Sequence, residues 1–178
     1  MKKVLFLCLC VIILVSGCSV KKMDEITESE EFAREFSVPS DNPFVYASLK
    51  DVFDMLNNGS GILFFGNSDC EICNIGAQTL TDVLIKNKVD VAYYYNPKKI
   101  METNGSNYKR LLKMIREDLN DDFDFSLPSV FVVKNGTIVG YNDDLAELVE
   151  NNEDQVLDND TKKELKNEYN KLIETIKE

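Results

Sequence analysis

The chain has 178 residues, of which 31 are acidic and 20 are basic, and its formal net charge is −11. This acidic balance argues against nucleic-acid binding and against electrostatic attachment to anionic lipid. The sequence contains no histidine, which excludes histidine-based catalysis and histidine-ligated metal sites. The length suits one domain with a hydrophobic core.

Residues 1–17 have the layout of a secretory signal peptide, with two lysines, an apolar stretch over 4–15 and then small residues. The apolar stretch is too short for a membrane-spanning helix. The segment Leu14-Val15-Ser16-Gly17-Cys18 resembles the lipobox of bacterial lipoproteins. That resemblance implies cleavage before Cys18 and a lipid thioether on Cys18, which would anchor the chain at the extracytoplasmic face of the cell membrane. The alternative is an ordinary signal peptide with a chance cysteine.

Of the five cysteines, only one pair is then expected to remain as thiols in the exported chain. Cys8 and Cys10 leave with the signal peptide, and Cys18 carries the lipid. Only Cys70 and Cys73 remain as thiols in the exported chain, which indicates a pair and not a disulfide framework.

Residues 18–42 are polar and charged, and we expect them to form a flexible, solvated tether. Phe32, Phe36 and Val38 indicate at most one weak amphipathic turn within it. The folded domain is expected to span residues 43–178.

Strands and helices alternate through this domain. The pattern predicts strands over 44–47, 61–66, 89–95, 127–133 and 137–141, and helices over 49–58, 71–87, 108–119 and 161–176. Residues 98–107 suit a loop, and the acidic stretch 143–160 holds at most one helical turn. Parallel crossovers come first and a hairpin comes last, which predicts an α/β fold with a mixed central sheet flanked by helices on both faces.

Three local signals support these elements. Ser48 is placed to cap the first helix of the domain, and Asn135-Gly136 suits a tight hairpin turn. Thr161 and Glu164 match a capping box at the start of the last helix.

The motif Cys70-Glu71-Ile72-Cys73 follows the apolar strand 61–66 and opens a helical pattern. A helix N-terminus favours a thiolate, so this position indicates a thiol–disulfide redox site. A structural disulfide is the less attractive reading, because a loop closed over two residues barely restricts the unfolded chain. A zinc site lacks ligands, since the pair supplies two thiolates and the chain has no histidine.

Two segments together resemble the thioredoxin family. They are the strand–Cys-x-x-Cys–helix junction over 62–78, and Leu127-Pro128-Ser129 followed by a strand and the Lys-Asn-Gly turn. The resemblance implies a thioredoxin-like fold in which Cys70 is the attacking thiolate and Cys73 the resolving thiol. It also implies that Pro128 is cis and that the Leu127 main chain pairs with an extended substrate. The alternative for Pro128 is a proline that simply starts an edge strand.

The motif departs from the thioredoxin pattern in three respects. No aromatic residue precedes Cys70, Glu71-Ile72 stands where Gly-Pro is usual, and Phe64 occupies the position of a buried aspartate. The acids Asp69 and Glu71 should raise the pKa of Cys70 above the value it would have beside neutral residues. A less stabilised thiolate favours a reductase or an isomerase over a strong oxidase.

The sequence therefore predicts a membrane-tethered, extracytoplasmic thiol–disulfide oxidoreductase. Its partners would be thiols or disulfides of exported proteins, or a membrane electron donor, and it would need neither a bound cofactor nor a metal. One alternative is a lipid-anchored binding or accessory module, for example in bacteriocin export, whose cysteines are not catalytic. Another is copper delivery through the two thiolates.

Overall fold

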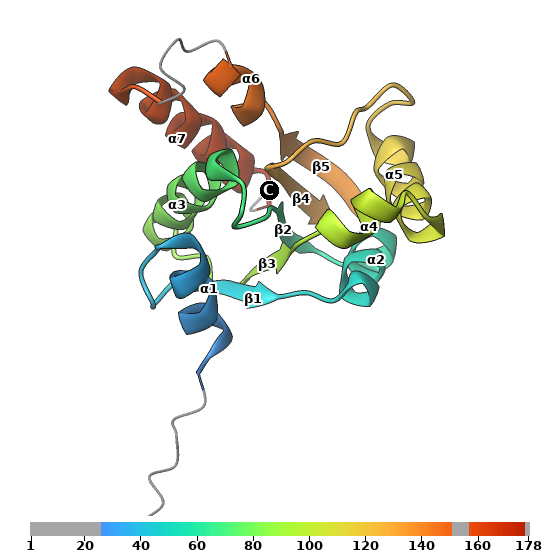
Figure 1. Cartoon of the computed structure of the whole chain (residues 1–178), viewed down its shortest axis with the longest axis horizontal. Coiled ribbons are helices and arrows are strands. Elements are labelled where there is room, and N and C mark those ends of the chain that lie inside the picture. The colour runs from blue at the N-terminus through green and yellow to red at the C-terminus, as the bar shows by residue number, and fades with distance from the viewer. Residues whose placement is uncertain (1–25, 151–156, 177–178) are drawn as a thin grey trace, which may run out of the picture.

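The computed structural model describes residues 26–150 and 157–176, which form one sheet with helices on both of its faces (Figure 1). The five strands are β1 (Phe44–Tyr46), β2 (Gly61–Phe65), β3 (Ala92–Tyr95), β4 (Ser129–Lys134) and β5 (Thr137–Asn142). Their order is β1-β3-β2-β4-β5. The first three strands run parallel, and β4 is antiparallel to both β2 and β5. The predicted α/β class with a mixed sheet is confirmed.

Helices pack on the two faces of this sheet in two groups. The described helices are α1 (Glu28–Phe36), α2 (Leu49–Asn58), α3 (Glu71–Lys86), α4 (Lys98–Thr103), α5 (Ser106–Asp118), α6 (Leu145–Glu150) and α7 (Asn159–Glu174). Side chains of α1, α3, α6 and α7 share one core cluster, and those of α2, α4 and α5 share the other.

The central strand β2 supplies both cores. Ile62 and Phe64 belong to the cluster under α1, α3 and α7, whereas Leu63 and Phe65 belong to the cluster under α2 and α5. Successive side chains of a strand point to opposite faces, so a strand covered on both sides must be apolar throughout. This requirement explains the unbroken apolar run from which the strand was predicted.

The N-terminal boundary of the domain requires a correction. Residues 28–36, expected to lie within the tether over 18–42, form helix α1. Phe32 and Phe36 lie one turn apart on this helix, and both are fully buried in the core. The helix begins with a capping box between Thr27 and Glu30. The fold therefore begins at α1 and not at residue 43.

Two of the three local signals are confirmed. Ser48 caps α2, and its side chain accepts a hydrogen bond from the Asp51 N–H group. Asn135 and Gly136 form the hairpin turn with φ angles of 52° and 80°, the left-handed values that such a turn requires. The third signal is wrong, because α7 starts two residues earlier than predicted and Asp158 caps it.

Residues 98–107 were predicted to be a loop, and that prediction is wrong for most of the segment. Helix α4 starts directly after β3, and α5 follows it after a left-handed turn at Asn104. The helical turn expected near residue 145 is confirmed as α6, which buries Leu145 and Val149.

No helix in the described part of the chain is both long and apolar enough to span a membrane. The expected signal peptide over 1–17 and the lipidation site Cys18 lie outside the described residues, so both stay predictions.

Candidate active site

The two cysteines lie at the junction between β2 and α3. The chain leaves β2 at Phe65, passes through a short loop and reaches Cys70, which is the N-cap of α3. Cys73 lies in the first turn of that helix. Cys70 is half-buried and Cys73 is fully buried, and both are free thiols.

The helix start supplies hydrogen bonds to the outer sulfur. The main-chain N–H group of Cys73 donates to Cys70 Sγ over 3.2 Å. Such N–H groups have no partner within the first turn of a helix, so a negatively charged acceptor is favoured there. Cys70 therefore lies where a nucleophilic thiolate is favoured, and Cys73 lies one helical turn further into α3.

The two sulfurs have opposite pKa shifts. The thiol of Cys73 donates a hydrogen bond to Cys70 and, together with the main-chain N–H groups, lowers the pKa of Cys70 from 9.0 to about 6 against the opposing effect of burial. The same hydrogen bond and burial raise the pKa of Cys73. At neutral pH the pair consequently holds one thiolate on Cys70 and one proton on Cys73.

Asp69 and Glu71 flank Cys70, but they do not determine the direction of its pKa shift. The Asp69 carboxylate pairs with Lys98 of α4 over 2.8 Å, so a cation faces this carboxylate. Glu71 is exposed to solvent. The pKa of Cys70 is lowered overall, because hydrogen bonds to its sulfur outweigh burial. That the two acids hold this pKa higher than neutral residues would stays a prediction.

Asn74 positions the cysteine loop, and the sequence analysis missed it. Its side-chain amide donates to the main-chain oxygen of Ser68 over 2.9 Å and to that of Cys70 over 3.0 Å. The Cys70 N–H group in turn donates to the Asn67 main-chain oxygen over 2.9 Å. These bonds fix the approach of the chain to the helix. The available signal was an asparagine one helical turn after the first cysteine.

The predicted proline loop lies against the same helix. The Leu127–Pro128 peptide bond is cis, as the family resemblance implied. A Cβ atom built on Gly76 of α3 would lie 3.1 Å from Pro128 Cγ and 3.1 Å from Leu145 Cδ2. Gly76 therefore allows the proline loop and α6 to approach α3 closely. This glycine is a second residue that sequence reasoning missed.

Leu127 has the features expected of a residue that binds a peptide backbone. Its side chain is half-buried and contacts both core clusters. No hydrogen bond between described residues engages its main chain. The pairing of this main chain with an extended substrate stays a prediction.

Aromatic rings surround Phe64, which lies six residues before Cys70. Phe64 is fully buried, and its ring packs 5.9 Å from that of Tyr94 and 6.4 Å from that of Phe32. The Tyr94 hydroxyl donates to Glu35 of α1 over 2.9 Å. The Phe64 side chain itself has no group that could exchange a proton with Cys73.

The arrangement suits thiol–disulfide exchange more than metal binding. Among residues 26–150 and 157–176, no group of three or more histidine, cysteine, aspartate or glutamate side chains could hold a metal ion. A thiolate with a protonated partner one turn away can instead attack a disulfide and then be released by that partner.

Comparison with known proteins does not assign the chain to a family. No protein-family model matches the chain, and no curated protein matches it. The chemistry of the site therefore rests on its own residues.

Proposed function

We propose that this chain is a membrane-tethered, extracytoplasmic thiol–disulfide oxidoreductase of thioredoxin-like fold that acts on cysteine pairs of exported proteins. The observation that carries the proposal is the opposite pKa shift of Cys70 and Cys73 at the start of α3. The cis Pro128 beside that helix supports it.

The reaction proceeds in two exchanges. The Cys70 thiolate attacks one sulfur of a substrate disulfide, forms a mixed disulfide and displaces the other substrate sulfur as a thiolate. Cys73 then loses its proton to solvent and attacks Cys70 Sγ. The Cys70–Cys73 disulfide forms, the second substrate sulfur leaves as a thiolate, and two electrons have passed to the substrate. A membrane electron donor or another dithiol would restore the reduced pair.

The direction of electron flow follows from how strongly the thiolate is stabilised. A pKa of about 6 for Cys70 is well above the value of about 3.5 found in the strongest periplasmic oxidant and closer to that of about 7 in thioredoxin. This supports a reductase-like or isomerase-like role.

The decisive experiment traps the partner. The full-length Cys73→Ser chain, expressed in its host, should accumulate mixed disulfides through Cys70, because the resolving thiol is gone. Mass spectrometry of the adducts released by dithiothreitol identifies the substrates. The Cys70→Ser/Cys73→Ser chain is the matched control and should yield none.

Catalysis in vitro separates this function from that of a binding module. The reduced chain should accelerate insulin reduction or the refolding of scrambled ribonuclease, and Cys70→Ser should abolish that acceleration. Reproducible absence of both adducts and acceleration would favour a lipid-anchored accessory module with non-catalytic cysteines.

A further inference from the structure

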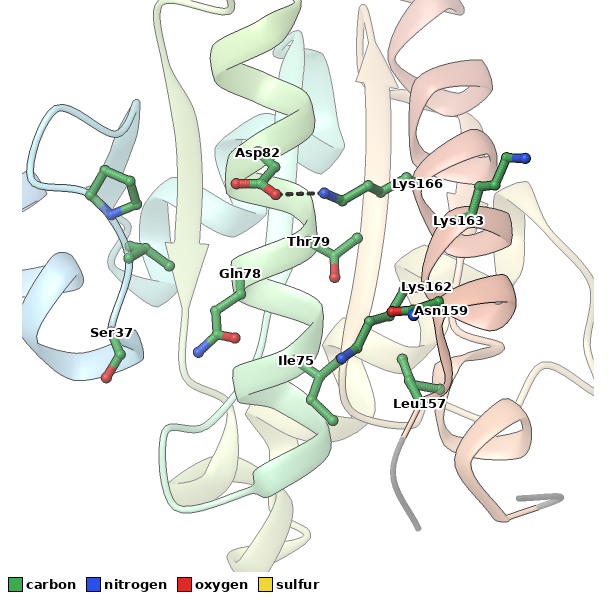
Figure 2. Close-up of a pocket in the computed structure, with 12 residues that line it drawn as sticks. Ser37, Ile75, Gln78, Thr79, Asp82, Leu157, Asn159, Lys162, Lys163 and Lys166 are labelled. Carbon is green, nitrogen blue, oxygen red and sulfur yellow. Dashed lines mark hydrogen bonds and ion pairs between the residues drawn. The ribbon is translucent and has the colours of Figure 1, made fainter. Parts of the chain in front are cut away.

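A groove lies along the outer face of α3, between α7 on one side and residues 37–39 on the other (Figure 2). Its volume is about 700 Å³. From α3 it is lined by Ile75, Gln78, Thr79 and Asp82. Residues three, four and seven apart share one face of a helix, and the same face continues back to Glu71 and Ile72 beside Cys70. The end of the groove at Ile75 therefore lies about one helical turn from Glu71 and Ile72.

The opposite wall of the groove carries positive charge. Lys162, Lys163 and Lys166 of α7 line it, and Asp82 is the one acid of the lining. Lys166 pairs with Asp82 over 2.6 Å. This local excess of cations stands out in a chain with a net charge of −11. It makes the groove complementary to a negatively charged ligand.

Two polar groups in the groove have no partner among the described residues. Lys162 forms no ion pair with them, and in Figure 2 its ammonium reaches across from α7 toward Ile75. Thr79 is only 6 % exposed, yet its hydroxyl makes no hydrogen bond with a described residue. Thr79 lines the groove, so its hydroxyl can donate to an acceptor on a bound ligand. Lys163 lines the groove as well, but its ammonium group points outward in Figure 2.

We infer that this groove binds an acidic, extended segment of the substrate polypeptide whose cysteine reacts with Cys70. The inference rests on the proposed function and names a substrate class for it. Carboxylates of the segment would accept hydrogen bonds from Lys162 and Thr79, and apolar atoms would contact Ile75 and Leu157 at the end nearer the cysteines.

The dimensions of the helix set the spacing between cysteine and acids. From Cys70 to Asp82 the helix rises by about 18 Å, at about 1.5 Å per residue. An extended peptide covers this length with about five residues, at about 3.3 Å each. The acidic residues are therefore expected at the second to fifth positions from the substrate cysteine.

A peptide fits this groove better than a membrane surface does. The cations lie between two helices, where a flat bilayer cannot reach Thr79.

Two synthetic peptides test the inference with the reduced full-length chain in detergent. Each contains one cysteine and is supplied as its own disulfide dimer. One peptide has aspartate and the other asparagine at the second to fifth positions on both sides of the cysteine. The kcat/KM of each reduction is measured and divided by the rate with dithiothreitol, which removes intrinsic differences between the dimers.

The acidic dimer should react about tenfold faster than the neutral one at low ionic strength, an advantage of about 1.4 kcal/mol. Lys162→Gln should reduce this advantage, and Lys162→Gln/Lys166→Gln should abolish it. Lys171→Gln, on the same helix but outside the groove, should leave it unchanged. Added salt should reduce it as well. Circular dichroism of each variant checks that it remains folded.

The outcomes separate the inference from the proposed function. If neither dimer is reduced, the proposed function fails. Equal normalised rates for both dimers would overturn the groove inference alone, and so would an advantage that survives the double substitution. Competition by phosphatidylglycerol vesicles, but not by phosphatidylcholine vesicles, would assign the groove to the membrane surface and overturn the proposal.

Discussion

The first turn of α3 and the aromatic core beneath it are held together by different forces. The turn is pinned by hydrogen bonds from Asn74 and carries the half-exposed sulfur of Cys70. The core under α1 is made of fully buried rings such as Phe32 and Phe64. Cys73 lies at the boundary between them, with its side chain in the core cluster and its N–H group in the turn. Two cysteines of one motif consequently have opposite pKa shifts, because one faces donors and the other faces an apolar interior.

The largest effect is expected from opening the aromatic core. Phe32→Ala removes a fully buried ring at the centre of that core and should destabilise the protein by about 3–5 kcal/mol, because a cavity remains. Urea unfolding measures this change. Ile26→Ala is the matched control, since Ile26 is exposed and its loss should have little effect. Equal unfolding midpoints for both variants would show that α1 contributes nothing to the fold.

A second prediction concerns the link between the two sulfurs. The rate of Cys70 alkylation by iodoacetamide should rise with pH around a midpoint of about 6. In Cys73→Ala the midpoint should move upward, because the hydrogen bond that contributes most to the lowered pKa of Cys70 is lost. A midpoint near 9 in the unsubstituted chain would contradict the geometry.

The same shift predicts how stability depends on pH. A thiol whose folded-state pKa is lowered contributes stability above its unfolded pKa and loses it as the pH falls through the folded value. For Cys70 the reduced protein should therefore become more stable as the pH rises from about 6 to about 9. Cys73 has a raised pKa, so its ionisation affects the stability of the protein only above this pH range. Cys70→Ser, compared across the same range by urea unfolding, should lack the increase.

A smaller loss of stability is expected when the hydrogen bonds that Asn74 makes to the cysteine loop are removed. Asn74→Ala removes the hydrogen bonds to Ser68 and Cys70 and should cost about 1–3 kcal/mol, at about 0.5–1.5 kcal/mol for each bond. Thiol–disulfide exchange should slow as well, because the Cys70 loop loses its fixed position. Asn170→Ala tests a side chain on α7 that also bonds a main-chain oxygen, away from the cysteines. Its exchange rate should stay unchanged.

The smallest effect is expected at the solvent-exposed end of the turn. Asp69→Asn breaks the surface ion pair with Lys98, and the unfolding midpoint should not change measurably. The alkylation midpoint of Cys70 should move only slightly, because hydrogen bonds to the sulfur set its charge. A large movement would show that charge and not hydrogen bonding controls this thiolate.

The sequence predicted those parts of the fold whose signal is local. The apolar strand before Cys70, the turn at Gly136 and the amphipathic helices all depend on neighbours within a few residues. Helix α1 was missed because its two phenylalanines stand among charges, although Thr27 and Glu30 form a capping box that could have revealed it. Its burial depends on rings that are distant in the chain, such as Phe44 and Phe64.

The cysteines of the candidate site could be predicted from the sequence, but the interactions that set their pKa values could not. The positions of Cys70 and Cys73 followed from the motif. The main cause of the lowered Cys70 pKa did not, because it is a hydrogen bond from the Cys73 side chain whose geometry the motif does not show. The contact of Gly76 with Pro128 joins two segments that no local pattern connects.

Helix α1 also fixes where the chain enters the domain relative to the reactive sulfur. Asn42, just ahead of β1, donates to the Ser29 main-chain oxygen over 2.8 Å, so the start of α1 lies at the edge where the parallel strands begin. Cys70 follows the end of β2 and lies at the edge where those strands finish. A five-residue strand separates the two edges by roughly 16 Å. An anchor placed ahead of α1 would thus hold the domain by one end and present its thiolate at the other, directed outward to arriving partners.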